Sequence, residues 1–390
     1  MMETKTETPA ADAPAVTRAA PPGNARTDPS KERQHIDPMT ASASRDVVAL
    51  FGLPFDVGDT NEMASRLRRF ALAGERCWLS TANLDWLLMA REDQAFRRAA
   101  LDSDMLTMDG GPVAALARGA GVVGASRVAG ADLFEALAAP TQERPLRVFF
   151  FGGRDGAAEA ATERLRDNAR AGAGLAPAGY LNPGYGDVSA MSAPDTLARI
   201  NDSGADLLIV SLGAAKGQAW IARNRHALTA PIVSHLGAVV DFTAGTIARA
   251  PSLVQRVGAE WAWRIGQDPA LWRRYARDAA ALPELLAEVR TLRALTSAQD
   301  EAGGEGSLQH DRTCGTLRIT GPTPTDQFRE ALSAARRVVL AENARPSLRA
   351  LGALLLAREE ARREGRTLLI EGEGPCAVRL LAASLGPQVG

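Results

Sequence analysis

Arginine and tryptophan side chains concentrate in one segment of the chain, residues 241–275. Its arginines and large aromatic residues are Arg249, Arg256, Arg264, Arg273, Arg274, Trp261, Trp263, Trp272 and Tyr275. Guanidinium groups bind phosphates through paired N–H donors, and Trp and Tyr rings favour membrane interfaces. The segment therefore suggests a site for a phosphorylated ligand, lipid-linked or free. The alternative is an ordinary amphipathic helix with a Trp face in the core and a solvated Arg face.

Asp109 is the residue best suited to act as a base. It follows the short stretch MLTM at the end of a predicted strand and precedes two glycines. A carboxylate in such a turn can deprotonate a hydroxyl group, although an aspartate there can also cap its own backbone. Thr81 and Asn83, at the end of another predicted strand, favour the catalytic interpretation if they face the same cleft.

Glycine-containing turns follow two further predicted strands. Gly152 and Gly153 lie where the first of these strands enters a helix, and backbone N–H groups at a helix N-terminus favour phosphate. Gly213 precedes Lys216 in the second turn, where the lysine ammonium could meet a diphosphate as a point charge. The turns match neither a P-loop nor a GxGxxG motif, so ordinary tight turns and a solvated lysine are the alternatives.

These candidate residues follow strands in a repeating pattern. Strand-like segments alternate with helical ones, and they cover residues 76–83, 105–111, 147–156, 204–213 and 231–242. Such alternation predicts a Rossmann-like α/β fold, with a mostly parallel sheet and helices on both faces. Ligands of these folds bind at the carboxyl ends of the strands. The residues expected at this edge include Thr81, Asn83, Asp109, Gly152, Gly213 and Asp241.

Composition predicts five parts in the chain of 390 residues. Residues 1–45, rich in Pro, Ala and charges, are predicted to form a disordered tail. An α/β core at 46–245 and a helical appendage at 246–296 follow. A polar linker at 297–311 then leads to a second, smaller α/β region at 312–390.

The overall composition excludes several classes of function. The formal net charge of −1 argues against a nucleic-acid-binding protein. Three dispersed cysteines and four histidines form neither a disulfide framework nor a metal-binding motif, which fits a reducing cytoplasm. No signal peptide is visible, and no run reaches the roughly 20 apolar residues that span a bilayer. Any membrane contact is therefore expected to be peripheral.

Short motifs along residues 47–275 together resemble those of the WecG/TagA/CpsF bacterial glycosyltransferases, glycosyltransferase family 26. The motifs are TAN at 81–83, DG at 109–110, RVAGADL at 127–133, FGG at 151–153, GADLLIVSLGAAKGQAW at 204–220, DFTAG at 241–245, RAP at 249–251 and EWAWRI at 260–265. Each motif is short, and their joint order over more than half of the chain carries the resemblance.

The resemblance implies an enzyme that transfers N-acetylmannosamine or a related sugar from a UDP-sugar. The acceptor would be a polyprenyl-diphosphate-linked sugar at the cytoplasmic face of the inner membrane, in exopolysaccharide or other surface-polysaccharide synthesis. Transfer would invert the anomeric centre and need neither a metal nor a cofactor besides the donor. The family's proposed base corresponds to Asp109, and its pocket-lining TxN motif to Thr81 and Asn83. The family's arginine-rich C-terminal appendage closes over the donor, and the corresponding residues here would be Arg249, Arg264 and Arg274.

Two positions depart from the family pattern. Gly217 stands where the family commonly has glutamine, and Gln218 is expected to replace that side chain. Leu271 stands where an arginine is common, and Arg273 or Arg274 is expected to compensate. With Asp109 as the catalytic base, the expected substrate-binding residues are Thr81, Asn83, Gly152, Gly153, Gly213, Lys216, Gln218, Asp241, Arg249, Arg264 and Arg274.

Residues 312–390 resemble a STAS domain, the fold of anti-sigma-factor antagonists, in their strand–helix order. The usual Asp-Ser pair corresponds here to Arg349 and Ala350, ahead of Gly352, so no hydroxyl is available for phosphorylation. The region is expected to dock a protein partner rather than to act as a phospho-switch, or only to add stability. The alternative to an enzyme is a catalytically silent, transferase-like scaffold that carries this module to a membrane assembly.

Overall fold

The computed structural model describes residues 45–248, 250–251, 254, 260–296, 307–323 and 325–386. Contacts along the chain divide it into two units, residues 1–38 and 39–390, and every described residue belongs to the second unit. The predicted disordered tail lies outside the described residues, apart from Arg45.

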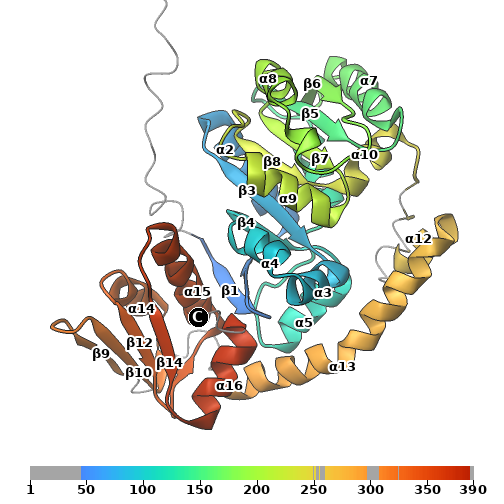
Figure 1. Ribbon diagram of the computed structural model, residues 1–390. Coiled ribbons are helices and arrows are strands. Elements are labelled where there is room, and N and C mark those ends of the chain that lie inside the picture. The colour runs from blue at the N-terminus through green and yellow to red at the C-terminus, as the bar shows by residue number, and fades with distance from the viewer. Residues whose placement is uncertain are drawn as a thin grey trace, which may run out of the picture. The chain divides into compact units, whose positions relative to one another are not determined.

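A six-stranded parallel sheet organises the first part of the described chain (Figure 1). Its spatial order is β4-β3-β8-β7-β5-β6, and every neighbouring pair is parallel. The strands are β3 (Cys77–Ala82), β4 (Met105–Met108), β5 (Leu146–Gly152), β6 (Leu175–Leu181), β7 (Leu207–Ser211) and β8 (Ile232–His235). The predicted α/β fold with a mostly parallel sheet is confirmed.

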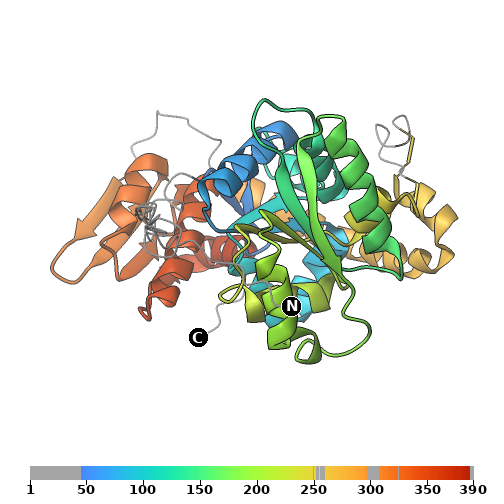
Figure 2. The ribbon, with the colours of Figure 1, turned by 90° about the horizontal axis from the view of Figure 1, so that it is seen from above.

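Helices cover both faces of this sheet (Figure 2). Each face has its own hydrophobic core, and the strands alternate their apolar side chains between the two. In β5, Val148 and Phe150 pack into the first core, whereas Phe149 and Phe151 pack into the second. The first core includes α2 (Thr60–Ala73), α6 (Gly130–Ala138), α7 (Ala157–Arg170) and α10 (Gly237–Ala244). The second includes α4 (Gln94–Leu101), α8 (Pro194–Asp202) and α9 (Ala214–Asn224). Ligands of such a sheet reach it at the strand ends.

The last strand of the sheet is shorter than predicted. Residues 231–242 were expected to form one strand, but β8 ends at His235 and the helix α10 begins at Gly237. The apolar run that follows His235 is compatible with strand or helix, and length alone does not separate the two. Val239 and Val240 are buried in the core beneath α7, which selects the helix. Asp241 consequently lies on a helix and not at a strand end.

Two other elements have no counterpart in the sequence analysis. The segment after Asn83 forms two helices, α3 (Leu84–Glu92) and α4. Asp93 separates them, and its carboxylate caps α4 by accepting the N–H of Ala95 at 2.8 Å. Strand β6 was not predicted, because Pro and Gly interrupt its sequence LAPAGYL and it lies half-buried at the sheet edge.

A hairpin of β1 (Val47–Leu50) and β2 (Leu53–Asp56) stands apart from the six-stranded sheet. Its position is set by the buried carboxylate of Asp56. That carboxylate pairs with Arg45 at 2.6 Å and accepts the backbone N–H of Leu106, in β4, at 2.8 Å. A buried carboxylate needs such partners, so the hairpin is held beside β4.

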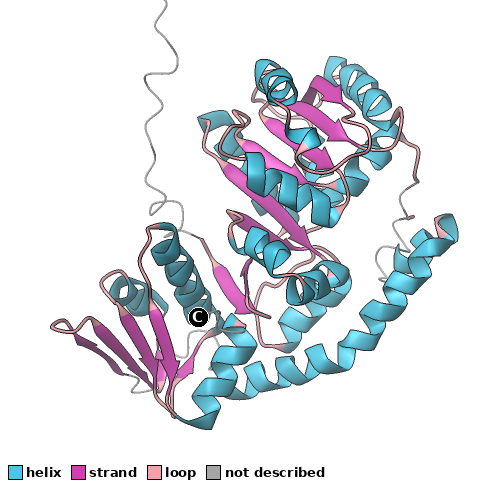
Figure 3. Cartoon of the chain, in the orientation of Figure 1, coloured by secondary structure: helices cyan, strands magenta, loops and turns pink. Residues whose placement is uncertain are grey.

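The chain that follows α10 forms the helical appendage. Its described elements are α12 (Glu260–Gln267), the 3-10 turn η2 (Pro269–Leu271) and α13 (Trp272–Leu295). Leu285, Val289 and Leu292 of α13 are buried against neighbours that include α3 and α5 (Gly111–Gly119). Figure 3 shows α13 running on toward the C-terminal sheet, where it contacts α16 (Gly374–Leu385).

The C-terminal region is a second α/β arrangement. Its four-stranded sheet has the order β14-β12-β10-β9, and only β9 is antiparallel to its neighbour. The strands are β9 (Ser307–Asp311), β10 (Thr316–Thr320), β12 (Arg337–Leu340) and β14 (Leu369–Gly372), with a short ladder of β11 (Pro322–Thr323) and β13 (Arg345–Pro346). The helices are α14 (Thr325–Leu332), α15 (Leu348–Arg363) and α16. Strand β9 corrects the predicted linker, because it occupies residues 307–311.

The C-terminal region shares one hydrophobic core with the β1–β2 hairpin and α13. Helix α15 approaches β1 so closely that a Cβ on Gly352 would lie 2.4 Å from the carbonyl oxygen of Val47. Beside this contact, Nη2 of Arg349 donates to Oδ2 of Asp46 at 2.8 Å. The described residues therefore form one packed unit, and the predicted boundaries between core, appendage and C-terminal region stay predictions.

Candidate active site

Asn83 and Asp109 lie side by side where the neighbouring strands β3 and β4 end. The backbone N–H of Asp109 donates to the carbonyl oxygen of Ala82 at 2.9 Å, which extends the β3–β4 pairing. A Cβ built on Gly110 would lie 3.9 Å from the Cβ of Asn83, so the two turns are in contact. Both residues are half-buried. The structure thus brings these two predicted site residues to one point of the sheet edge.

Asn83 has a local structural task as well. Its side-chain oxygen accepts the N–H of Trp86 at 2.9 Å, so it is the N-cap of α3. The cap fixes the amide group and directs its oxygen into the helix, which leaves the Nδ2 donors for a ligand. Thr81 faces α6: its Oγ1 lies 3.5 Å from the position that a Cβ on Gly130 would take.

The glycine turns after β5 and β7 fit together closely. A Cβ on Gly152, where φ is 89°, would lie 2.6 Å from the carbonyl oxygen of Ser211 in β7. Gly153 donates its N–H to that same oxygen at 2.8 Å. Gly213 begins α9 without a side-chain cap, so the first N–H groups of that helix have no side-chain partner there. Uncapped N–H groups at this edge suit an anionic ligand.

Two predicted binding residues on α9 point in different directions. Lys216 lies in the exposed first turn, and its Nζ donates to the carbonyl oxygen of Gly186 at 2.8 Å. Gln218 is buried, and its Nε2 donates to Oγ of Ser80 at 3.1 Å. Gln218 was expected to replace a side chain missing at Gly217, but its amide is committed to the interior between α9 and β3.

The imidazole of His235 fills the space beside Gly217. A Cβ on Gly217 would lie 2.2 Å from Cδ2 of His235, and one on Gly237 would lie 3.4 Å from its Nε2. That Nε2 is buried without a hydrogen-bond partner among the described residues. Burial lowers the pKa of His235 to about 4, against the opposing effect of a hydrogen bond to its own backbone. The ring is therefore neutral at pH 7.

Asp241 gathers charges from two other segments. Its carboxylate is half-buried, and Oδ1 accepts a hydrogen bond from Oγ1 of Thr246 at 3.4 Å. Burial raises the pKa of Asp241, and the positive charges of Arg154 and Arg264 oppose that rise. Arg154 belongs to the turn between β5 and α7, and Arg264 belongs to α12 of the appendage. Charges from the glycine turn and from the appendage therefore both act on this carboxylate of α10.

Helix α13 is tied to the start of α3 by charges. Arg274 stacks over the ring of Tyr275, with its guanidinium carbon 4.8 Å from the ring centroid, and its Nε lies 4.0 Å from Oδ2 of Asp85. Arg277 forms an ion pair with the same aspartate. Asp278 is buried next to them. Its pKa is raised to about 6, mainly by burial and to a smaller extent by the negative charge of Asp85.

The tryptophans of the appendage are exposed rather than buried in a core. Trp261 is 53% and Trp272 is 56% exposed, which contradicts the interpretation of this segment as a helix with a Trp face in the core. Trp263 is also partly exposed, and its Nε1 donates to the carbonyl oxygen of Ala248 at 3.2 Å. Arg249, a predicted lid residue, lies outside the described residues.

Several charged residues of this edge were not predicted. Asp85, Arg154, His235 and Arg277 are among the 95 Arg, Lys, Asp, Glu and His residues of the chain and have no distinctive spacing. The only sequence signal was adjacency, since Asp85 follows the TAN motif and Arg154 follows the FGG motif. Their partners lie in distant segments, so folding alone reveals them.

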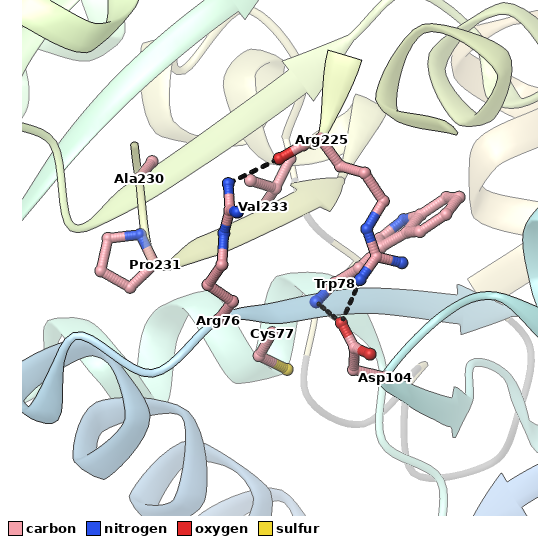
Figure 4. A pocket seen from close by; sticks show the side chains of 8 residues that line it. All are labelled: Arg76, Cys77, Trp78, Asp104, Arg225, Ala230, Pro231 and Val233. Atoms are coloured by element: carbon pink, nitrogen blue, oxygen red, sulfur yellow. Dashed lines mark hydrogen bonds and ion pairs between the residues drawn. The ribbon is translucent and has the colours of Figure 1, made fainter. Parts of the chain in front are cut away.

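A small surface pocket lies at the opposite, amino-terminal edge of β3 and β8 (Figure 4). Arg225 and Asp104 pair across it at 3.2 Å, and the guanidinium carbon of Arg225 lies 5.3 Å from the ring centroid of Trp78. Arg76 donates to the carbonyl oxygen of Arg225 at 2.7 Å. Burial raises the pKa of the Cys77 thiol, which makes it a poor nucleophile. These charges satisfy one another, and we assign the pocket a structural role.

The described residues contain neither a metal-binding cluster nor a membrane-spanning helix. Among them, no group of three or more His, Cys, Asp or Glu side chains could hold a metal ion. Within the same ranges, no helix is long and apolar enough to cross a membrane. Independence from metals and peripheral membrane contact stay predictions.

Comparison with known proteins shows a family and a similar relative. The model of the glycosyl transferase WecG/TagA/CpsF family matches residues 48–295, which is more than half of the chain. The chain is also similar to an N-acetylglucosaminyldiphosphoundecaprenol N-acetyl-beta-D-mannosaminyltransferase of Bacillus spizizenii. The two are 29% identical over 197 residues, which cover 50% of this chain and 74% of the relative. The range matched by the family model includes the sheet edge with Asn83 and Asp109.

Proposed function

The chain belongs to the WecG/TagA/CpsF family of glycosyltransferases, and on that premise we propose that it transfers an N-acetylmannosamine-type sugar from a UDP-sugar to a polyprenyl-diphosphate-linked sugar. It is a hexosyltransferase. The name of the Bacillus relative, which specifies an N-acetylmannosaminyl group and a lipid-diphosphate-linked acceptor, supports the choice of substrates. The product would enter a bacterial surface polysaccharide, such as an exopolysaccharide.

Asp109 is the general base of the proposed reaction. Its carboxylate takes the proton of the acceptor hydroxyl while the hydroxyl oxygen bonds to the anomeric carbon of the donor. The bond from that carbon to the UDP oxygen breaks on the opposite face, so the configuration inverts. The observation that carries this proposal is the contact between the Asp109 and Asn83 turns at the ends of adjacent strands. Asn83 then offers its Nδ2 donors to the substrate beside the base.

Positive charge must balance the diphosphate that leaves as UDP. We assign this task to the uncapped start of α9, where Gly213 is the N-cap, and to Lys216 in its first turn. Arg264 and Arg274 add guanidinium groups from the appendage, and their link to α10 and α3 supports a lid that closes over the donor. This arrangement would leave no step that requires a metal.

The acceptor is attached to a lipid, so we propose that the enzyme works at the cytoplasmic face of the membrane. The exposed rings of Trp261 and Trp272, next to Arg273, support membrane contact through the appendage. Trp rings favour the interface, and arginines attract anionic lipid headgroups. Vesicles that contain anionic lipid should therefore bind a larger fraction of the full-length protein than vesicles without it.

For the C-terminal region we retain the STAS-like assignment as a proposal. The strand–helix order β10, α14, β12, α15, β14, α16 supports it. Helix α15 begins near Arg349, which stands in place of a phosphorylatable residue. This end of the helix packs against the β1–β2 hairpin of the same chain. We therefore propose that the main docking partner of this region is its own transferase core, and that any other protein binds on a remaining face.

The decisive experiment measures UDP release by the purified full-length protein. A panel of UDP-sugars would be offered with a short-chain polyprenyl-diphosphate-sugar acceptor, with and without EDTA. Loss of a general base lowers the rate about 10²–10⁴-fold, so the rate of UDP release by Asp109→Asn should fall by that factor. Asp167→Asn, an exposed aspartate at the far end of α7, is the matched control. Full activity of Asp109→Asn would remove the base assignment, and UDP binding without any release would favour the scaffold alternative.

A further inference from the structure

The loop that follows β6 lies at the carboxyl ends of two neighbouring strands, β5 and β7. It leaves the end of β6, which pairs with β5. Nδ2 of Asn182 donates to Oδ1 of Asp155, in the turn between β5 and α7, at 3.2 Å. Farther along, the carbonyl oxygen of Gly186 accepts a hydrogen bond from Nζ of Lys216, in the first turn of α9, at 2.8 Å. Because β5 and β7 are paired, residues 182–186 connect the turns at which both strands end.

Hydrogen bonds within the loop fix its backbone on both sides of the tip. Oδ1 of Asn182 accepts the N–H of Gly184 at 3.0 Å, which closes a turn around Pro183. On the other side, Oδ1 of Asp187 accepts the N–H of Ala190 at 2.7 Å. The tip is therefore held in place before any ligand binds.

The tip of this loop carries a tyrosine ring that is open to solvent. Tyr185 lies between two glycines and is 96% exposed, the highest value among the exposed large apolar side chains of the described residues. Aromatic rings offer a large apolar surface that other groups usually cover at least in part. A ring that a fixed loop holds in solvent, at the edge where ligands of such sheets bind, is available to stack on a ring of the ligand.

The contact with Lys216 places this ring close to the proposed site of the donor diphosphate. In the proposed function, Lys216 and the uncapped start of α9 balance the diphosphate of UDP. Gly186, which contacts Lys216, is the residue directly after Tyr185. In UDP a single ribose joins the diphosphate to the uracil, so the base must lie near the same turn.

We propose that Tyr185 stacks on the uracil ring of the UDP-sugar and so contributes to the affinity for the donor. The inference rests on the proposed function, and it adds a residue that lies in none of the motifs that carry the resemblance. Stacking tolerates any base, because every base presents a π face. The ring of Tyr185 therefore adds affinity without selecting uracil over other bases.

The charge of the loop favours a nucleobase over a lipid surface as the occupant. Tyr rings also favour membrane interfaces, where basic side chains add attraction to anionic headgroups. Residues 182–193 contain no Arg or Lys, and their one charged residue is acidic, Asp187. The exposed tryptophans that lie among arginines belong to the appendage, which is a different segment.

The test compares the wild type, Tyr185→Ala and Tyr185→Phe in the full-length protein. Calorimetric titrations with UDP and with inorganic pyrophosphate separate the base from the diphosphate. Tyr185→Ala should weaken UDP binding about tenfold, equivalent to about 1.4 kcal/mol, and leave pyrophosphate binding unchanged. Tyr185→Phe keeps the ring and should bind UDP like the wild type. Leu369→Ala, which truncates a 52% exposed side chain in β14 of the C-terminal sheet, is the control.

Steady-state kinetics and stability give two further readouts. Tyr185→Ala should raise the KM for the UDP-sugar more than it lowers kcat, because the base takes no part in the reaction. Its midpoint in urea denaturation should equal that of the wild type, because the ring is exposed. A lowered midpoint would assign the ring a structural role and overturn the inference.

The binding results separate failure of the inference from failure of the proposed function. Unchanged UDP affinity in Tyr185→Ala, with a wild type that binds UDP, would overturn the inference and leave the proposed function intact. Equal losses in Tyr185→Ala and Tyr185→Phe would show a contact through the hydroxyl group and overturn stacking. A higher KM for the lipid-linked acceptor alone would assign the ring to the other substrate and overturn the choice of uracil. A wild type that neither binds nor releases UDP would overturn both proposals.

Discussion

Replacing Gly352 by alanine should destabilise the whole folded unit. The glycine lies in α15 against the first strand, and an added Cβ would lie 2.4 Å from the carbonyl oxygen and 2.8 Å from the carbonyl carbon of Val47. Ordinary contacts begin near 3.4 Å, so α15 and β1 would have to separate by about 1 Å. Val47 cannot turn its carbonyl away at no cost, because it belongs to the ladder with β2.

The expected magnitude combines two opposing effects. Overpacking of a close contact costs about 1–3 kcal/mol. Alanine is about 1 kcal/mol more favourable than glycine inside a helix, which offsets part of that cost. We therefore expect the free energy of unfolding to fall by up to about 2 kcal/mol. Urea denaturation of the full-length protein, followed by far-UV circular dichroism and Trp fluorescence, would measure it.

Gly266→Ala is the matched control for this experiment. Gly266 also lies inside a helix, α12, but nothing stands within 4 Å of the position that its Cβ would take. Its replacement should therefore leave the protein equally stable or up to about 1 kcal/mol more stable. If Gly352→Ala behaved like Gly266→Ala, the close packing of the C-terminal region on β1 would be refuted, and with it the docking of that region in cis.

Three further predictions follow from buried groups. Gly217→Ala should lower the free energy of unfolding by about 1–3 kcal/mol, because the added Cβ would meet the ring of His235. Combining it with His235→Ala should restore most of that loss, as measured by urea denaturation. Arg97→Ala should lower the free energy of unfolding by about 2–4 kcal/mol, because its buried Nη2 donates to the carbonyl oxygens of Gly52 at 3.2 Å and Leu385 at 3.0 Å; an unchanged urea midpoint would contradict this. Because the pKa of Asp278 is raised to about 6 in the folded state, the native protein binds this proton more tightly than the unfolded chain, and stability from this group is lost as pH rises from about 4 to 6. Asp278→Asn should therefore gain stability relative to the wild type between pH 4.5 and 7.5, and a constant difference between those values would refute the shift.

The fold class was accessible from the sequence because it depends on local patterns. Apolar strands that end in Gly, Asp or Asn turns and alternate with helices leave few options besides a parallel α/β sheet. The same patterns located Asp109 and Asn83, since the carboxyl ends of parallel strands share one edge. Residues next to these motifs, such as Asp85 and Arg154, carried no separate signal.

Local ambiguity set the first limit of prediction. The run after His235 is apolar enough for a strand, and only burial of Val240 beneath α7 made it a helix. Asp241 therefore lies on a helix and has other neighbours than a residue at a strand end would have. Strand β6 was missed for another reason, because Pro177 and Gly179 interrupt its sequence, which an edge strand tolerates.

The sequence alone is enough to assign the α/β class and the family, and it points to one edge of the sheet as the candidate site. Which side chains lie free at that edge depends on tertiary contacts. Gln218 looked available but bonds to Ser80, and the space beside Gly217 belongs to His235, which stands 18 positions later in the chain. Likewise, the arginines around Asp241 come from segments on either side of it. The physical reason is that burial, charge balance and steric fit depend on neighbours in space, and periodicity records only neighbours in sequence.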